Sequence, residues 1–461
     1  MRLPSDLLHA ISQPEGGRVV LVVGAGCSAE PPTSLPLSRE LALNAHRKLV
    51  EDGVLDGGDC PEPDSLSCVA DAVWSKTNSQ RDLIVRFPCD CLHQAEPNRG
   101  HLLTAAMLYE QALSCVLTLN FDLALSNALS QIGAHGNVTI INKPEDYASF
   151  GLSNLVYLHR NVNADPDRWV LRSISLEESW RDGWEKIVTE RVLSAPVTVF
   201  VGLGSSIGVL EESALRILDK LRGVVRVYQV DPSTISESSL FKKLGLPTEV
   251  YLQMSWCEFM DRLANRVVKE HCANLEQACI DQIQEHGWDS EDIHTLCQRI
   301  TQDGLIKLGK IRARWTLNTA LYLPQRSVLT KWIADLLIVV GFIERKSGSQ
   351  AVFRPDGIIE FRRDNSIIGM VIAAHGQGYL RWPALEMRIK HSQQYNDYGD
   401  YEIVRAIISG VQGIEPTDVA PPENIVWQEE PNSLIPVPKR LKMYNIDRIR
   451  EEPDLIMELL S

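Results

Sequence analysis

Four short segments of this chain carry residue types that could bind a nucleotide and act on it. They are Gly24-Ala25-Gly26-Cys27-Ser28, Thr118-Leu119-Asn120-Phe121-Asp122, Leu158-His159 and Gly202-Leu203-Gly204-Ser205-Ser206. A turn of small residues lets backbone N–H groups approach a diphosphate closely, because no Cβ is in the way. We therefore expect a nucleotide to be held beside the first of these segments.

The elements that must position these segments can be read from the spacing of apolar residues. The unbroken run Val19 to Val23 is typical of a strand buried on both faces of a parallel sheet. Further strands are expected at 115–120, 138–141, 155–158, 168–171, 197–201, 225–230 and 248–252. Helices are expected between them at 66–87, 99–113, 123–132, 176–193, 208–222 and 256–270. Strands alternating with helices predict an α/β fold, a Rossmann-like doubly wound parallel sheet whose carboxyl edge carries the four segments.

Length and composition bound the class of protein. The 461 residues suggest two or three domains, and 44% apolar with 23% charged residues is ordinary for a globular chain. The net charge of −14 argues against general coating of nucleic acid. No signal peptide and no apolar stretch of about 20 residues is visible. With ten scattered cysteines, these features favour a cytoplasmic protein with reduced thiols and no membrane contact.

The order and character of the four segments resemble the sirtuin-like NAD-binding family. That family has a GAG-x-S turn, a T-x-N-x-D motif, a catalytic histidine in an L-H-G motif and a later glycine–serine turn. The similarity covers residues from about 15 to 270, and Pro97-Asn98-Arg99-Gly100-His101-Leu102 also resembles bacterial members. The resemblance implies a catalytic NAD-binding domain over residues 1–270.

The resemblance also implies roles for single residues. Asn120 would orient the reacting water or ribose, and His159 would be the general base. Asp122 and Thr118 accompany Asn120 in the same motif, with Asp122 expected to stabilise the loop. The remaining cofactor-binding residues would hold the diphosphate, ribose and adenosine phosphate, and they are Gly24, Ala25, Gly26, Ser28, Gly202, Gly204, Ser205 and Asp231.

Two departures from the family change the expected chemistry. No cysteine lies between Cys115 and Cys257, so the zinc module of sirtuin deacylases cannot be assembled and no metal is expected. This moves the prediction from protein deacylation to NAD hydrolysis, as in bacterial antiphage sirtuin-like effectors. Arg160 stands where the family has glycine, and it could clamp a phosphate, lower the pKa of His159 or obstruct the pocket.

Structural interpretations of the same residues stay open. The glycine turns at 24–28 and 202–206 could be tight turns without a ligand, and Asp122 could be only a helix N-cap. His159 could be a structural histidine, and Asp231, which precedes proline, is a turn former. Cys27 is expected to be packed, and His101 to belong to the core or to a helix cap.

The chain beyond residue 270 is expected to be a smaller α+β region, 271–461, with a regulatory or oligomerisation role. Within it, residues 315–355 predict a winged helix: a helix at 327–337, a turn at Gly341-Phe342-Ile343-Glu344-Arg345, and two short strands. Alternating residues at 358–361 and 367–372 predict an antiparallel sheet. Residues 306–350 carry eight Lys or Arg against two acids, so nucleic-acid contact stays open without being favoured.

The sequence therefore predicts a cytoplasmic NAD glycohydrolase that cleaves the nicotinamide–ribosyl bond, with NAD as substrate. The resemblance implies antiphage defence by NAD depletion, a homo-oligomer, and a partner such as a HerA-type ATPase or an Argonaute-like activator. One alternative is a non-catalytic NAD- or ADP-ribose-sensing DNA-binding regulator. A second is a zinc-free protein deacylase.

Overall fold

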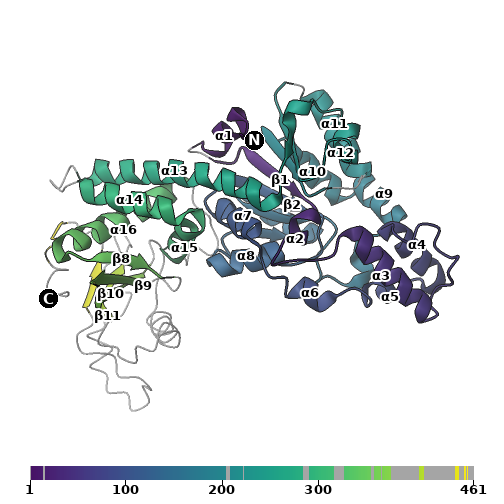
Figure 1. Cartoon of the computed structure of the whole chain (residues 1–461), viewed down its shortest axis with the longest axis horizontal. Coiled ribbons are helices and arrows are strands. Elements are labelled where there is room, and N and C mark those ends of the chain that lie inside the picture. Colours follow the sequence, from purple (N-terminus) through teal and green to yellow (C-terminus); the bar gives the residue numbers. More distant parts are fainter. Residues whose placement is uncertain are drawn as a thin grey trace, which may run out of the picture. The chain divides into compact units, whose positions relative to one another are not determined.

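The computed structural model describes residues 2–13, 16–203, 208–221, 223–283, 290–315, 326–354, 358–364, 366–374, 404–409, 442–445, 451–452 and 454. The chain divides into two compact units (Figure 1). Unit 1 comprises Met1–Gln131 and Val138–Val267, and unit 2 comprises Ile132–Asn137 and Val268–Ser461.

Unit 1 is built on a seven-stranded sheet in the order β3-β4-β2-β1-β5-β6-β7. Every neighbouring pair is parallel, so the predicted doubly wound parallel sheet is confirmed. The strands are β1 Val19–Val23, β2 Leu113–Thr118, β3 Thr139–Ile141, β4 Asn154–Tyr157, β5 Val197–Val201, β6 Arg226–Asp231 and β7 Tyr251–Gln253.

The strand order places a reversal point at β1. After β1 the chain builds β2, β3 and β4 on one side of it, then returns to add β5, β6 and β7 on the other. In open α/β sheets, ligands bind at the carboxyl ends of the strands beside such a reversal. The loops that follow β1, β2 and β5 all leave the sheet there.

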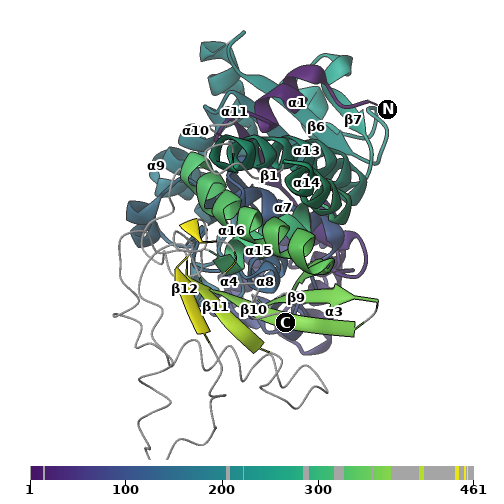
Figure 2. The same ribbon diagram turned by 90° about the vertical axis from the view of Figure 1, so that its left-hand side faces the viewer.

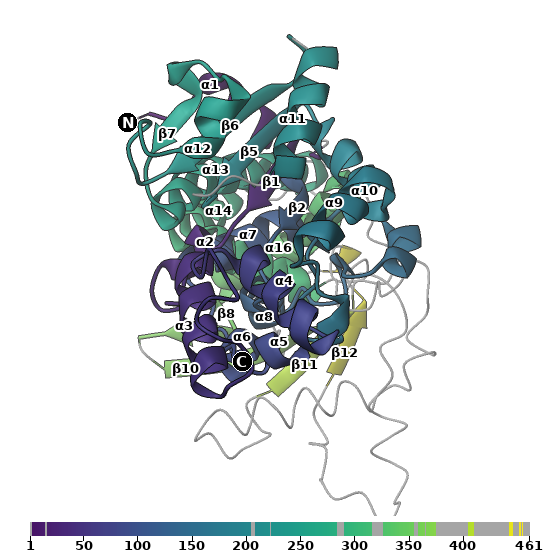
Figure 3. The same cartoon turned by 90° about the vertical axis from the view of Figure 1, so that its right-hand side faces the viewer.

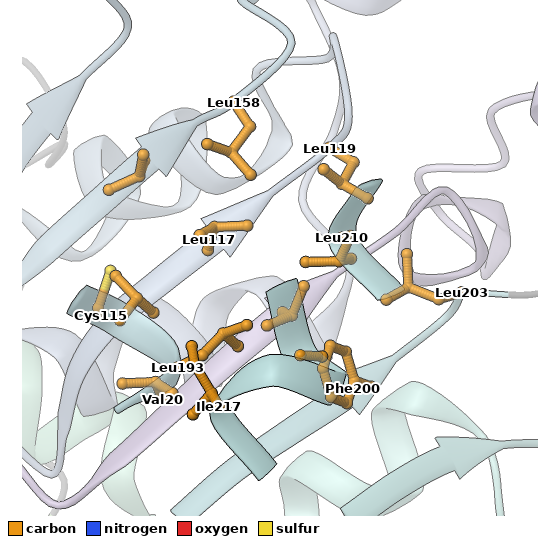
Figure 4. Packing of buried hydrophobic residues seen from close by; sticks show 14 of the residues in the cluster. Val20, Cys115, Leu117, Leu119, Leu158, Leu193, Phe200, Leu203, Leu210 and Ile217 are labelled. Carbon is orange, nitrogen blue, oxygen red and sulfur yellow. The ribbon is translucent and has the colours of Figure 1, made fainter. Parts of the chain in front are cut away.

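The core of unit 1 follows from the alternation of side chains along the strands. Val20 and Val22 of β1 share one face with Leu117 of β2 and Phe200 of β5, and all four are buried in one apolar cluster. Figure 4 shows Val20, Leu117 and Phe200 with Leu193, Leu210 and Ile217 from the helices over that face. Because all five residues of β1 are buried, its other face is covered as well.

The helices of unit 1 connect these strands. They are α1 Ser5–Ile11, α2 Gly26–Ala29, α3 Ser38–Glu51, α4 Leu66–Thr77, α5 Arg81–Ile84, α6 Cys89–His93, α7 Arg99–Tyr109, α8 Ala124–Ile132, α9 Ser173–Asp182, α10 Trp184–Leu193, α11 Gly208–Lys220 and α12 Ser239–Leu244. Short 3₁₀ turns, η1 Pro144–Ser149, η2 Pro166–Arg168 and η3 Thr248–Val250, complete the list.

Several expected boundaries are wrong in detail. The predicted helix 66–87 is interrupted after Thr77, because Asn78 takes the left-handed conformation (φ 55°) that ends α4. The predicted strand 168–171 does not exist, because these residues lie in η2 and the extended segment after it. The predicted helix 176–193 is two helices, α9 and α10, separated at Gly183.

The helices α3, α4, α5 and α6 form a helical module within unit 1. Figure 3 shows these helices, coloured purple to blue, gathered together. Their buried side chains form a second apolar cluster, which also includes Val162, Trp169 and Leu171 from the chain after β4, with Phe121 packed against it. The module therefore rests on the loops that leave β2 and β4.

Unit 2 contains helices and a five-stranded mixed sheet. Helix α13, Trp256–Ile283, begins in unit 1 and is continuous into unit 2. The other elements are α14 Glu291–Asp303, α15 Leu305–Trp315, α16 Arg326–Ser347, β8 Gln350–Phe353, β9 Ile358–Arg363, β10 Ser366–Ala374, β11 Val404–Ser409 and β12 Lys442–Asn445. Strands β9 and β10 are antiparallel neighbours, as predicted, and β8 pairs antiparallel with β9. Strands β10, β11 and β12 pair in parallel (Figure 2).

The turn predicted for a winged helix is wrong. Residues 341–345 lie inside α16, a 22-residue helix that continues to Ser347. A Cβ at position 341 would lie only 3.0 Å from Ile293 Cδ1. Glycine at this position therefore allows α14 to approach α16 closely. The helix therefore needs this glycine for packing and not for a turn.

Among the helices of the described ranges, none is both long enough and apolar enough to cross a lipid bilayer.

Candidate active site

The centre of the site is a hydrogen-bonded group of three buried side chains from two of the four segments. Ser28 Oγ donates to Asp122 Oδ2 at 2.9 Å. Asn120 Nδ2 donates to Ser28 Oγ at 3.1 Å and to the Gly24 carbonyl at 3.2 Å. The loops that follow β1 and β2 are therefore joined side chain to side chain, although about ninety residues separate them.

His101 adds a fourth buried side chain to this network. Its backbone N–H donates to Asn98 Oδ1 (3.1 Å), and its Nδ1 accepts from the Asn98 N–H (3.3 Å). With Nδ1 an acceptor, the proton of the neutral ring is on Nε2, which lies 3.5 Å from Ser28 Oγ. Burial lowers the pKa of His101 to about 3, so the ring is neutral at physiological pH. Its place is the helix cap and core expected from the sequence.

Asn98 fixes the loop after β1. The residue is fully buried and caps α7 through the bond to the His101 N–H. Its Nδ2 donates to the Cys27 carbonyl at 2.8 Å and to the Glu30 carbonyl at 3.3 Å. One side chain thus starts a helix and holds the turn that carries Ser28.

Asp122 has a structural and a site-facing contact. Its Oδ1 accepts from the Ala124 N–H at 3.0 Å, which forms an Asx turn directly before α8, and its Oδ2 accepts from Ser28. Burial raises the pKa of this carboxyl, while the bonds from Ala124 and Ser28 act against the rise. The contacts of Asp122 stabilise the loop before α8, whereas the N-cap position of that helix is Leu123, whose carbonyl accepts from the Asn127 N–H.

Thr118 supports Asn120 from the end of β2. Its hydroxyl accepts from the Asn120 N–H at 3.1 Å, and Thr118 is fully buried. It orients the Asn120 backbone and has no surface to offer a ligand in this conformation. Because Asn120 commits both protons of its amide nitrogen to Gly24 and Ser28, the amide oxygen is the atom left to meet a ligand.

The first turn, residues 24–28, requires glycines because the turn after β5 lies directly against it. The Gly24 N–H donates to the Val201 carbonyl (2.9 Å) and the Gly26 N–H to the Gly202 carbonyl (3.0 Å). A Cβ on Gly24 would lie 2.5 Å from the Gly202 carbonyl oxygen. Two of the N–H groups expected to cradle a diphosphate are therefore used within the protein.

Ala25 is the residue of this turn that stays available. Among the described residues none accepts from its N–H, and Ala25 is half-buried. At the facing turn, Gly202 has φ +66°, and a Cβ there would lie 2.7 Å from the Cys27 nitrogen. Gly204 and Ser205, which were expected to close around the adenosine part, lie outside the described residues.

His159 stands on the same sheet edge as Asn120. Thr118 and Tyr157 are paired across β2 and β4, so Asn120 and His159 each lie two residues beyond a paired position. The two loops continue together, since the Val162 N–H donates to the Phe121 carbonyl at 2.9 Å. The His159 ring stacks on Phe121 with centroids 6.3 Å apart.

His159 is half-buried as a residue, while the Nε2 atom of its ring is buried. Among the described residues, none lies within hydrogen-bond distance of His159 Nε2. Burial lowers the pKa of His159 to about 4, and the positive charge of Arg160 adds to the effect. The ring is therefore neutral at physiological pH, and a hydrogen bond from a ligand or water to Nε2 would remove the cost of this unsatisfied nitrogen.

Arg160 turns away from the site. Its Nη2 donates to Glu185 Oε1 at 2.9 Å, its Nη1 donates to the Leu158 carbonyl, and its guanidinium lies 5.2 Å from the centre of the Trp184 ring. Both partners of the ion pair are nearly buried, at 12% and 3% exposure of their side chains. Arg160 is thus engaged by α10 and neither clamps a phosphate nor blocks His159 in this conformation.

Asp231 ends β6, on the far side of β1 from His159. Its Oδ1 accepts from the Ser233 N–H at 2.8 Å, and its backbone carbonyl accepts from the Met254 N–H. The residue is buried and shapes the turn through Pro232. It belongs to the same sheet edge but makes no described contact with the Ser28 network.

The sequence argument did not assign two supporting residues. Asn98 was part of a quoted segment, and its position directly before a helix was the signal of an N-cap. Nothing in the sequence indicated the role of Glu30. Its carboxylate accepts from the Trp256 N–H (2.6 Å) and the Cys257 N–H (3.2 Å) at the start of α13. In the described residues no group of three or more His, Cys, Asp or Glu could hold a metal ion.

No protein-family model matches this chain, and no curated protein matches it. Among solved structures, the chain is similar to a triple mutant of a Sir2 homologue with 2′-O-acetyl ADP-ribose, at 17% identity and a TM-score of 0.33, over 58% of this chain and 97% of that one. It is also similar to a Sir2 homologue–NAD complex, at 17% identity and a TM-score of 0.32, over 58% and 95% of the two chains. With TM-scores this low, the fold assignment depends on the strand order and register described above.

Proposed function

We propose that unit 1 is an NAD glycohydrolase that cleaves the nicotinamide–ribosyl bond. The observation that supports this most is the position of two residues, Asn120 and His159. They stand at matched positions on the carboxyl ends of neighbouring strands, beside the reversal point of the sheet. Nε2 of His159 has no hydrogen-bond partner among the described residues, and the amide oxygen of Asn120 is not engaged in the bonds of that side chain to Gly24 and Ser28.

The proposed reaction uses these two atoms on one water molecule. The water oxygen bonds to C1′ of the ribose, the bond from C1′ to the nicotinamide nitrogen breaks, and nicotinamide leaves with that electron pair. The proton released by the water passes to His159 Nε2 and then to solvent. The Asn120 oxygen would hold the water or a ribose hydroxyl. The products are ADP-ribose and nicotinamide.

Ser28, Asp122 and His101 support this reaction by holding Asn120 rigidly. Rigid placement of the first layer by a second hydrogen-bonded layer is a general requirement of catalytic sites. The Ala25 N–H is the group of the glycine turn that would meet the diphosphate, because those of Gly24 and Gly26 are bonded to the turn after β5.

The test is release of nicotinamide from NAD by the purified chain. We expect His159→Ala and Asn120→Ala each to lower turnover by at least about 100-fold. His93→Ala, an exposed histidine of α6, is the matched control and should leave the rate unchanged. Equal rates for wild type and His159→Ala would disprove the role of His159.

A second candidate is an NAD- or ADP-ribose-binding sensor without turnover. The low pKa of His159, about 4, favours it, because a histidine that holds a proton so weakly is a poor base at neutral pH. Such a protein would bind NAD stoichiometrically and release no nicotinamide. Calorimetric binding without product distinguishes it from the hydrolase.

The antiphage role and regulation by unit 2 rest on the resemblance to bacterial defence effectors. A potent NADase must stay inactive until infection, which suggests oligomerisation or a partner as the trigger. Nicotinamide release that appears only with extract from infected bacteria would support this role, and constitutive turnover in healthy cells would oppose it.

A further inference from the structure

Two cysteines of the helical module lie in direct contact. Cys60 Sγ donates to Cys68 Sγ across 3.3 Å. Cys60 stands in the loop before α4, and Cys68 is in the first turn of α4, where its N–H donates to the N-cap Ser65. Eight residues along the chain separate the two thiols, so the contact is local and is fixed by the start of the helix.

The two thiols differ in exposure. Cys60 is 4% exposed and packs in the apolar cluster of the module, whereas Cys68 is only partly buried and reaches solvent. Burial raises the pKa of the Cys60 thiol, so Cys60 stays protonated until its partner reacts. A small oxidant from solvent can therefore meet Cys68 first.

The contact between Cys60 and Cys68 can be compared with a cysteine elsewhere in the helical module. None of the ten cysteines is in a disulfide, and a hydrogen bond joins the thiols of Cys60 and Cys68. Cys91 is exposed on α6 and offers an internal comparison, because it is accessible without a described thiol partner.

We propose that Cys60 and Cys68 are a peroxide-oxidised site that closes to an intramolecular disulfide. In the first step the Cys68 sulfur attacks one oxygen of a hydroperoxide, the O–O bond breaks, and Cys68 becomes a sulfenic acid while an alcohol or water leaves. In the second step the Cys60 sulfur attacks the Cys68 sulfur, and the hydroxyl leaves as water with the Cys60 proton. The protein loses two electrons and two protons, and the peroxide is reduced.

The geometry allows closure with little rearrangement. A disulfide needs the two sulfurs about 2.05 Å apart, so they must approach by little more than an ångström. Cys60 belongs to a loop rather than to a helix or strand, and it can supply this movement. The bond would tie the loop before α4 to the first turn of that helix.

The test is oxidation of the reduced full-length chain with graded hydrogen peroxide, followed by alkylation and peptide mapping. We expect a linked pair of peptides containing Cys60 and Cys68, two hydrogens lighter than the reduced pair. Cys91→Ser should form the same linked pair at the same peroxide dose. Separate alkylation of Cys60 and Cys68, at doses that already oxidise Cys91, would overturn the proposal.

Two variants test the order of the steps. In Cys60→Ala the Cys68 sulfenic acid has no resolving thiol, so dimedone should label Cys68. In Cys68→Ser, Cys60 should stay reduced at the same dose. Oxidation should also raise the melting temperature of the wild type by a few degrees, and not that of Cys68→Ser; an unchanged melting temperature in both, with no linked peptide, would count against the site.

Discussion

At the scale of single residues, the site depends on a few buried polar groups that hold loops together. Asn98 bonds through its side chain to the carbonyls of Cys27 and Glu30 and to the His101 N–H. The Cys27 carbonyl and the His101 N–H are buried and cannot turn to water when the asparagine is removed. Their loss therefore costs the desolvation of each group as well as the bonds.

We expect Asn98→Ala to lower the free energy of unfolding by about 2–4 kcal/mol, as measured by urea denaturation. Asn44→Ala is the matched control, because Asn44 is exposed on α3 and its side chain accepts a hydrogen bond from the neighbouring, exposed Arg47. The control should change stability by less than about 0.5 kcal/mol. Equal effects of the two substitutions would contradict the role given to Asn98.

Arg160 and Glu185 form a pair whose members depend on each other. Arg160 has φ +73°, where glycine is less strained, so Arg160→Gly relieves the backbone. The substitution also leaves Glu185 buried without its partner, which outweighs that gain. We expect Arg160→Gly to destabilise the chain by about 2–4 kcal/mol, and Arg160→Gly with Glu185→Gln to recover at least about half of the loss. A double-mutant cycle measured by denaturation gives the coupling, and purely additive effects would show that the pair is not coupled.

The low pKa of His159 predicts a pH dependence of stability. The pKa falls from the usual 6.5 to about 4 in the folded protein because of burial and then because of Arg160. Between these values the unfolded chain binds more protons than the folded one, so stability rises with pH and is lost as pH falls from 6.5 to 4. The contribution of His159 is on the order of 3 kcal/mol over that window.

We expect the free energy of unfolding to decrease more steeply with acid in the wild type than in His159→Phe. Phenylalanine keeps an aromatic ring against Phe121 and removes the titrating group. His101, whose pKa is also lowered, to about 3, adds a slope in the same direction that both proteins share. Parallel pH profiles for the two proteins would mean that His159 titrates normally.

At the scale of elements, the glycine turns after β1 and β5 pack against each other, and this contact sets their composition. Gly202 and Gly223 both have left-handed φ, +66° and +86°. A Cβ on Gly202 would strike the Cys27 backbone nitrogen at 2.7 Å, whereas a Cβ on Gly223 would meet open space. Substitutions at the two positions therefore separate the cost of backbone strain from the cost of disturbing the close approach of the two turns.

We expect Gly223→Ala to cost about 1 kcal/mol of stability, the cost of a left-handed alanine. Gly202→Ala should cost at least about 2 kcal/mol more and should weaken NAD binding, because α2 and Ser28 must move. Thermal unfolding with and without NAD measures both effects. Equal costs at the two positions would mean that the turns after β1 and β5 do not need to touch.

At the scale of the whole molecule, the net charge of the chain limits the classes of partner that it can bind. The chain carries a net charge of −14, yet residues 306–350 hold eight basic residues against two acids. Several of these basic residues have partners within the fold: Lys307 donates to the Phe353 carbonyl, Arg345 pairs with Asp292, and Arg312 is buried. Part of the local excess of positive charge is therefore engaged in interactions within unit 2.

We expect the full chain to bind duplex DNA no more tightly than about 1 μM at about 0.15 M salt, the range of non-specific contact. Fluorescence anisotropy with labelled duplexes checks this expectation. Tight, salt-resistant binding would instead support the DNA-binding regulator. Lys307→Ala should reduce stability rather than DNA affinity.

The sequence by itself determined the parallel sheet and the edge at which the candidate residues stand. Both depend on local signals: the buried run Val19 to Val23, and the small or polar residues directly after it. The expected positions of Asn120 and His159 at strand ends followed from the same periodicity, because side-chain patterns repeat within a few residues.

Only the tertiary structure decided what each residue touches. Gly24 and Gly26 bond to the turn after β5, Asn98 reaches back to Cys27, and Arg160 pairs with Glu185. The predictions of a winged-helix turn and of a strand at 168–171 were wrong because both were inferred from local sequence signals alone. Gly341 was taken as a local turn signal, but its use is set by the approach of Ile293 from another helix. Contacts between segments far apart in the chain leave no periodicity in the sequence, so packing alone selects them.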